Sequence, residues 1–164
     1  MLMRLLRHVT DVSLGKTSIG LIRSSHWPNV EQTHRKLQPA CVACGETQAI
    51  NVHHIFPFHY CVSLGRPDLE LDQRNLITLC ETSKTRKTQD HHLLIGHMDN
   101  FKSSNLEVTE DASKTFKYMT ADQIRANPLW LAKEVKKLKL LNDMSTQEKQ
   151  DFTDLMNKTF PKLG

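Results

Sequence analysis

Two short apolar segments stand out in the first half of this chain. Residues 49–53 read Ala-Ile-Asn-Val-His and are closed by Pro57, and residues 76–79 read Leu-Ile-Thr-Leu and lead into Cys80. Apolar runs of this length, bounded by turn-forming residues, are typical of β-strands. The stretch between them, residues 62–74, contains glycine and proline and predicts a polar loop. We therefore expect two short strands in this region.

Helices are predicted before and after these strands. Residues 27–37 carry apolar positions at helical spacing behind a proline in the first turn, and Pro39 stops them. The last third of the chain has three helix-start signals, namely the capping-box pairs Thr120/Gln123 and Ser145/Glu148 and the dipeptide Asn127-Pro128.

Apolar stripes follow these starts, the first formed by Leu131, Val135 and Leu138 and the second by Phe152, Leu155, Met156 and Phe160. Stripes of this kind pack against a core or a partner helix, and nothing in them indicates a cofactor. Residues 1–22 show neither helical periodicity nor strand alternation, so we expect an N-terminal arm there. With 164 residues, of which 38% are hydrophobic, the chain can form one compact unit with helical extensions.

Charge adds a modest preference for a polyanionic partner. The formal net charge is +4, and residues 1–40 hold six Lys or Arg against two Asp or Glu. A basic arm suits nucleic acid, although a mildly basic surface also serves solubility alone. The chain has neither the apolar run of a signal peptide nor a stretch of about 20 apolar residues that could cross a bilayer. We therefore expect a cytoplasmic protein with no membrane partner.

Cysteines and histidines are grouped in a way that favours a metal site. Cys41-x2-Cys44 presents two thiolates from one turn, and Cys80 and His91 can supply the two further ligands of a tetrahedral zinc ion. Such a Cys3His site contributes directly to folding free energy. The alternatives are free buried thiols, with Cys61 as a substitute ligand or, more simply, a small apolar core residue.

His53 and His54 are consecutive at the end of the first predicted strand. Adjacent side chains on a strand point to opposite faces, so the two imidazoles can do different work. One can hold a metal while the other faces a substrate. A pair of adjacent histidines is also found as a surface accident or as a satisfied core group, and only the neighbouring motifs separate these readings.

Taken together, the motifs resemble those of the HNH endonuclease family, and are similar to its bacteriophage branch. The segments that carry the resemblance are Cys41-x2-Cys44, Val52-His53-His54-Ile55-x-Pro57-Phe58, Asn75-Leu-Ile-Thr-Leu-Cys80, His92, and the run from Gly96 to Lys102. The resemblance covers roughly residues 23–110 and implies an α+β fold with a small ββα-metal core, flanked by an N-terminal arm (1–22) and a C-terminal helical extension (111–164).

The resemblance also implies roles for individual residues. His53 and His92 match ligands of a catalytic ion, with His97 as a further ligand or a phosphate contact. His54 matches the general base, and Asn75 matches the residue that ties the loop and orients this base. In place of the family's cysteine the chain has His91, which leaves His91 and His92 exchangeable between the two metals. The expected catalytic ion is Mg²⁺ or Mn²⁺, and imidazole ligands also accept Ni²⁺ or Zn²⁺.

The implied function is metal-dependent hydrolysis of one DNA strand, giving a 5′-phosphate and a 3′-hydroxyl. Candidate phosphate contacts, which can equally be solvated loop residues, are Lys84, Arg86, Lys87 and Lys102. The expected partners are DNA and either a second copy of the chain or a phage packaging enzyme, in the host cytoplasm if the chain is phage-encoded. The alternative is a zinc-stabilised DNA-binding or packaging-accessory module that is active only with a partner.

Overall fold

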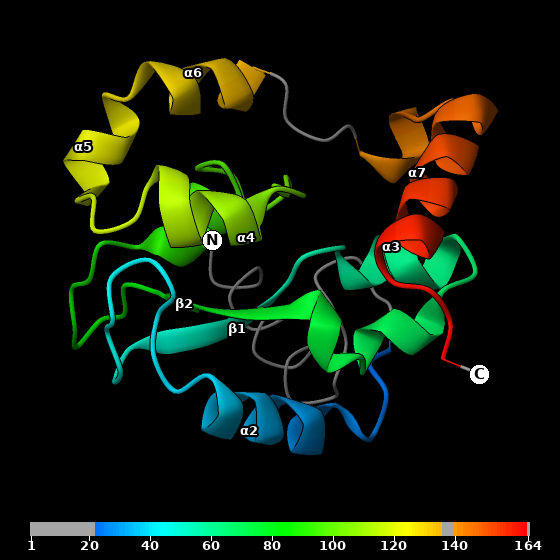
Figure 1. The fold of residues 1–164 in the computed structure, drawn as a ribbon, viewed down its shortest axis with the longest axis horizontal. Helices are drawn as coiled ribbons and strands as arrows, with labels where there is room; N and C mark the ends of the chain where they lie inside the picture. The colour runs from blue at the N-terminus through cyan, green and yellow to red at the C-terminus, as the bar shows by residue number, and fades with distance from the viewer. Residues whose placement is uncertain (1–21, 136–139, 164) are drawn as a thin grey trace, which may run out of the picture.

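The computed structural model describes residues 22–135 and 140–163, and within that part it shows a mixed α/β fold around one small sheet (Figure 1). Almost all of the expected N-terminal arm therefore lies outside the described residues. The sheet has two strands, β1 (Ile50–His54) and β2 (Leu76–Cys80). The helices are α2 (Trp27–Leu37), α3 (Phe58–Ser63), α4 (Val108–Glu110), α5 (Ala121–Arg125), α6 (Pro128–Val135) and α7 (Thr146–Thr159). Two π-helical segments, η3 (His92–Gly96) and η4 (Asp111–Thr115), and three 3₁₀ turns, η1 (Pro67–Glu70), η2 (Gln73–Asn75) and η5 (Leu141–Asp143), complete the order.

The two strands are antiparallel and their register fixes which side chains share a face. Ile50 pairs with Cys80 and His54 pairs with Leu76, so His53 lies opposite Ile77. Helix α2 contacts both strands on one face, and η3 contacts both strands on the other. Both predicted strands are thus confirmed within a residue or two of their expected bounds.

Local sequence signals explain most of the helix ends. Helix α2 has a proline in its first turn and ends before Pro39, as predicted. The capping boxes at Thr120 and Ser145 are both formed, with each hydroxyl accepting a hydrogen bond from the backbone three residues on. The expected polar loop at residues 62–74 is more ordered than predicted, because the end of α3, η1 and η2 fill most of it.

The C-terminal helices share one hydrophobic cluster with the sheet. Phe56, just after β1, makes edge-on contacts with the rings of Phe152 and Phe160, with centroids 5.5 and 5.7 Å apart. Of the second predicted stripe, Phe152 and Met156 are buried while Leu155 is 42% exposed. In the first stripe Leu131 is 46% exposed, and the side chains of Val135 and Leu138 lie outside the described residues.

Helix α6 supports the segment that follows β2. The indole Nε1–H of Trp130 donates to the Leu94 carbonyl at 2.8 Å, and Asn105 donates to the Ile95 carbonyl at 3.0 Å. Carbonyls near the end of a short helix need such partners, so these two side chains fix η3 from outside. Among the described residues no helix has the length and apolar character to cross a membrane.

Candidate metal centres

The first candidate centre consists of three cysteines and one histidine that meet at one end of the sheet. The ligand atoms of Cys41, Cys44, Cys80 and His91 all lie within 4.8 Å of one another. His91 Nδ1 is 3.5 Å from Cys41 Sγ and 3.4 Å from Cys80 Sγ, and Cys44 Sγ is 3.8 Å from Cys80 Sγ. These separations suit four ligands of one tetrahedral ion, since Zn–S and Zn–N bonds of about 2.3 and 2.0 Å place neighbouring ligand atoms under 4 Å apart. The cluster can therefore hold a metal such as zinc.

The local backbone explains how two of these thiols come from one turn. The Gly45 N–H donates to the Cys41 carbonyl and the Cys41 N–H donates to the Glu46 carbonyl, which closes a tight turn after the first cysteine. Gly45 has φ of +82°, a conformation that residues with a Cβ adopt only with strain. The glycine is therefore needed for the turn that presents Cys41 and Cys44 to the same point.

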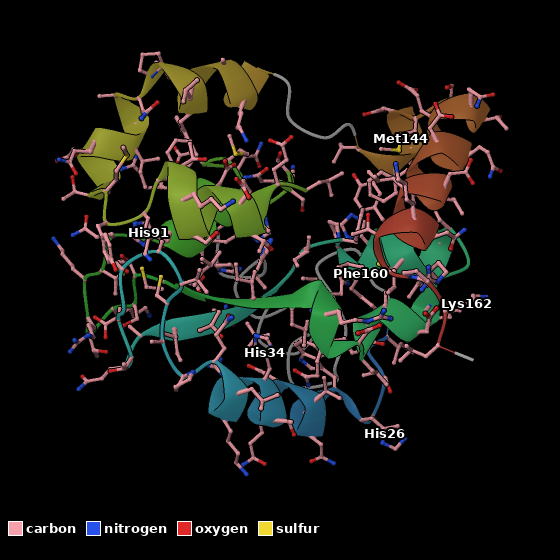
Figure 2. All side chains as sticks on the ribbon, viewed as in Figure 1. His26, His34, His91, Met144, Phe160 and Lys162 are labelled. Atoms are coloured by element: carbon pink, nitrogen blue, oxygen red, sulfur yellow. The ribbon has the colours of Figure 1, made fainter. Side chains whose placement is uncertain are left out.

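Hydrogen bonding prepares the other two ligands. His91 Nε2 donates to the Met119 carbonyl at 3.0 Å, which leaves Nδ1 as the nitrogen that faces the thiols. Figure 2 shows sulfur atoms near the labelled His91. Cys41 hydrogen-bonds to Cys80, and this bond, followed by that to His91, lowers the pKa of Cys80 to about 3. Cys61 stands apart from the cluster, because its Sγ donates to the Phe56 carbonyl and burial raises its pKa to about 12.

The second candidate centre consists of three histidines on the face of the sheet that is opposite α2. His53 comes from β1, whereas His92 and His97 begin and follow η3, and their ligand nitrogens lie within 4.8 Å of one another. The ring of His53 has its centroid 5.2 Å from that of His92 and 4.8 Å from that of His97. Nε2 of His53 and Nδ1 of His92 are buried without a hydrogen-bond partner. Buried polar atoms normally have a partner, so both nitrogens are suited to bind a metal ion.

The π-helical form of η3 brings His92 and His97 together. Residues five apart lie on different sides of an α-helix, but the wider π-helical turn places them nearly above one another. His97 Nδ1 donates to the Ser103 carbonyl at 2.7 Å, so Nε2 is the nitrogen left to face the other rings. Gly96 packs directly on the third ring, because a Cβ built there would lie 3.1 Å from His53 Cε1.

Two of the three imidazoles, those of His53 and His97, are suited to metal ligation by their charge state. Burial, reinforced by the neighbouring His97 and His92, lowers the pKa of His53 well below its usual value. Burial also lowers the pKa of His97 to about 4, with His92 adding to the effect. Neutral imidazoles are the form that binds metals. The structure also divides the two adjacent histidines, placing His91 with the cysteines and His92 with His53.

His54 lies on the other face of β1, against α2. Its Nε2–H donates to the Glu70 carbonyl at 2.9 Å, and the indole of Trp27 stacks on its ring with centroids 4.6 Å apart. Because a carbonyl only accepts, the proton stays on Nε2 and Nδ1 is left as the acceptor. Burial, followed by the charge of Arg23, lowers the pKa of His54 to about 3. The ring is neutral at physiological pH.

Asn75 ties the loop, but its side chain does not orient His54 directly as expected. Its Oδ1 accepts from the Phe56 N–H at 2.8 Å, and its Nδ2 donates to the carbonyls of Phe56 and Leu69. The Glu70 carbonyl, one residue after Leu69, holds His54 instead. The Asn75 amide is fully used by the backbone, so Asn75 affects His54 only through the loop.

The candidate phosphate contacts differ in how free they are. Lys84, Lys87 and Lys102 are exposed. Arg86 is engaged, because its guanidinium donates to both carboxylate oxygens of Glu46 and to Gln48 at 2.7 Å. No sequence pattern predicts the pairing of Arg86 with Glu46, since the two residues lie 40 positions apart.

Two residues beside the histidine cluster were missed from the sequence. Glu81 has its Oε1 3.5 Å from His92 Nδ1, and the first cause of its lowered pKa is the interaction with His92. Phe101 is 58% exposed and its ring centroid lies 5.0 Å from that of His97. The position of Glu81 directly after Cys80 was the available signal, but an acidic residue in a polar loop is unremarkable by itself. Comparison of the chain with protein-family models, with curated proteins and with solved structures finds no significant match.

Proposed function

We propose that this chain is a metal-dependent DNA endonuclease of the HNH type that hydrolyses one phosphodiester bond at a ββα-metal core. The observation that carries the proposal is the cluster of three imidazoles that His53 forms with His92 and His97 beside a two-stranded sheet. Such a cluster can hold a catalytic ion with positions left for substrate. The family resemblance assigns proton transfer to the neighbouring His54, which a backbone carbonyl holds in one tautomer.

The order and packing of the elements support the ββα-metal assignment. Two antiparallel strands are followed in the chain by η3, which contacts both of them and carries His92 and His97 at its ends. The nearby cysteine cluster supports it as well, because a structural ion would stabilise a core with only two short strands.

The chemistry is divided among the chain's own residues. His53, His92 and His97 would hold the catalytic ion, which when bound stabilises the negative charge that develops on the phosphate. Nδ1 of His54 accepts a proton from the water that attacks phosphorus, while Nε2–H stays on the Glu70 carbonyl. Trp27 keeps the ring in plane by stacking, and Asn75 positions the loop through Leu69. The 3′ oxygen leaves, giving the 5′-phosphate that the family resemblance implies.

DNA is the proposed substrate because the chain offers unpaired positive charge near the site. Lys84, Lys87 and Lys102 are exposed, and the whole chain carries a net charge of +4. Contacts of this kind bind phosphate without reading sequence.

The proposal is tested by conversion of supercoiled plasmid to open circles in Mg²⁺, Mn²⁺, Ni²⁺ or EDTA. We expect metal-dependent nicking that falls by about 10²–10⁴-fold in His54→Ala, because general-base catalysis is lost. His26→Ala is the matched control, since His26 is exposed, directly precedes α2 and belongs to neither cluster. Equal nicking by the wild type and His54→Ala would contradict the assignment of the base.

One observation favours a second candidate function, a zinc-stabilised module that acts only with a partner. His53 is 4% exposed and His54 is 7% exposed, so both rings are covered in the isolated chain. A second copy of the chain or a phage packaging enzyme would then have to open the site. DNA binding without nicking, followed by nicking when such a partner is added, would favour this candidate.

A further inference from the structure

Glu81 has a carboxylate oxygen beside the histidine cluster. Among the described residues it is the one carboxylate that forms an ion pair with a histidine of that cluster. It directly follows β2, and its N–H donates to the Ala49 carbonyl at 2.9 Å, which extends the ladder by one residue pair. Side chains two apart on a strand share a face. The register therefore places Glu81 on the same face as Ile77 and Leu79, which are paired with His53 and Asn51.

The contact between Glu81 and His92 is close but is not a hydrogen bond. Oε1 lies 3.5 Å from Nδ1, yet Nδ1 remains a buried nitrogen without a hydrogen-bond partner. Two ligands of one ion adopt this relation, because metal bonds of about 2.1 Å at tetrahedral angles put ligand atoms about 3.4 Å apart. This separation from His92 matches that of neighbouring ligands of one cation, whereas the ligand atoms that all lie within 4.8 Å of one another are those of the three histidines alone.

The carboxylate is held in place from its other oxygen. Asn51 Nδ2 donates to Glu81 Oε2 at 2.6 Å, from the neighbouring strand. Ligating carboxylates are commonly fixed by such an outer hydrogen bond. The Glu81 side chain is 35% exposed, so an ion from solvent can reach its carboxylate.

We propose that Glu81 is a ligand of the ion held by His53, His92 and His97, and that it makes the site accept hard divalent ions such as Mn²⁺. The inference rests on the proposed function and extends it to the choice of metal. Three neutral imidazoles alone favour Ni²⁺ or Zn²⁺, whereas oxygen ligands are those that Mg²⁺ and Mn²⁺ prefer. One anionic oxygen also offsets part of the charge that the ion brings into a buried site.

The test is direct titration of Mn²⁺ and Ni²⁺ into the full chain whose cysteine cluster has first been loaded with Zn²⁺, followed by calorimetry. We expect Glu81→Gln to weaken Mn²⁺ binding at least tenfold and to weaken Ni²⁺ binding by a smaller factor. Asn51→Ala, which frees the carboxylate without removing it, is expected to fall between the wild type and Glu81→Gln. Glu110→Gln, on the exposed surface of α4, is the matched control and is expected to bind both ions as the wild type does.

His92→Ala separates failure of this inference from failure of the proposed function. If His92→Ala loses the second ion while Glu81→Gln binds Mn²⁺ like the wild type, the histidine site stands and the role of Glu81 is overturned. If neither substitution changes binding of Mn²⁺ or Ni²⁺, the histidine site itself is overturned, and the role of Glu81 with it. Circular dichroism of each variant verifies that the fold is retained.

Discussion

The cysteine cluster and the histidine cluster lie on one small sheet but differ in every property that decides what a metal does. The first offers four protein ligands, and Cys41, Cys80 and His91 are at most 2% exposed. The second offers three imidazoles with Glu81 beside them. Closed four-ligand sites stabilise folds, whereas sites with an open position carry out chemistry. The comparison supports the proposal that one metal stabilises the fold and another acts on a substrate.

The largest effect on metal binding and stability is expected from removing a ligand of the cysteine cluster. Cys80→Ser removes a ligand that is fully buried, and we expect loss of zinc together with loss of the cooperative thermal transition, because metal binding and folding are coupled. Cys61→Ser is the matched control, since Ser keeps the hydrogen bond to the Phe56 carbonyl. Zinc content and thermal melting measure both. A Cys80→Ser protein that melts like the wild type would show that the cluster is not structural.

The next largest effect is expected at the histidine cluster alone. His97→Ala removes one imidazole whose orientation Ser103 fixes, and we expect affinity for the second ion to fall by about 10–100-fold while zinc content stays at the wild-type value. Calorimetry on zinc-loaded protein measures the affinity. Loss of zinc in this variant would mean that the two clusters are not independent.

A smaller effect is expected from adding a methyl group next to the histidine cluster. In Gly96→Ala the new Cβ would lie 3.1 Å from His53 Cε1 and 3.2 Å from His53 Nδ1, so the ring must shift. We expect the second ion to bind several-fold more weakly and the protein to lose about 1–3 kcal/mol of stability, as in other overpacked sites. Gly45→Ala gives the comparison, because it strains the cysteine turn and should lower zinc affinity instead. Unchanged binding of the second ion in Gly96→Ala would contradict the close packing on His53.

The smallest effect is expected from the exposed lysines. Lys102→Ala removes one charge near Phe101, and we expect weaker DNA binding. In a plot of the logarithm of the binding constant against the logarithm of the salt concentration, the slope should be smaller by about one. Arg86→Ala should change the slope less, because its guanidinium is already paired with Glu46. Binding measured by fluorescence anisotropy across a salt series tests both, and a larger change for Arg86 would reverse this ranking.

Sequence patterns predicted the features that depend on local chemistry. The strands, the proline start of α2 and both capping boxes follow from neighbouring residues, and the spacing of Cys41, Cys44 and Cys80 indicated the first cluster. The opposite faces of His53 and His54 followed from strand geometry alone.

The features that depend on distant contacts were not predictable. Nothing in the sequence marks η3 as π-helical, although this form is what aligns His92 with His97. The Glu70 carbonyl replaces Asn75 as the direct partner of His54, because the amide of Asn75 is used by Phe56 and Leu69. A backbone acceptor 16 residues away leaves no trace in side-chain spacing.

The division of labour between the two clusters is tested most directly in zinc-loaded His53→Ala, with His26→Ala as the control. Metal ions per chain are counted, and the melting temperature and plasmid nicking in Mn²⁺ are measured. We predict that His53→Ala keeps its zinc and its melting temperature but loses the second ion and the nicking activity, while His26→Ala keeps all four. Nicking that survives in His53→Ala, or zinc that is lost with it, would contradict the separation of a structural from a catalytic metal.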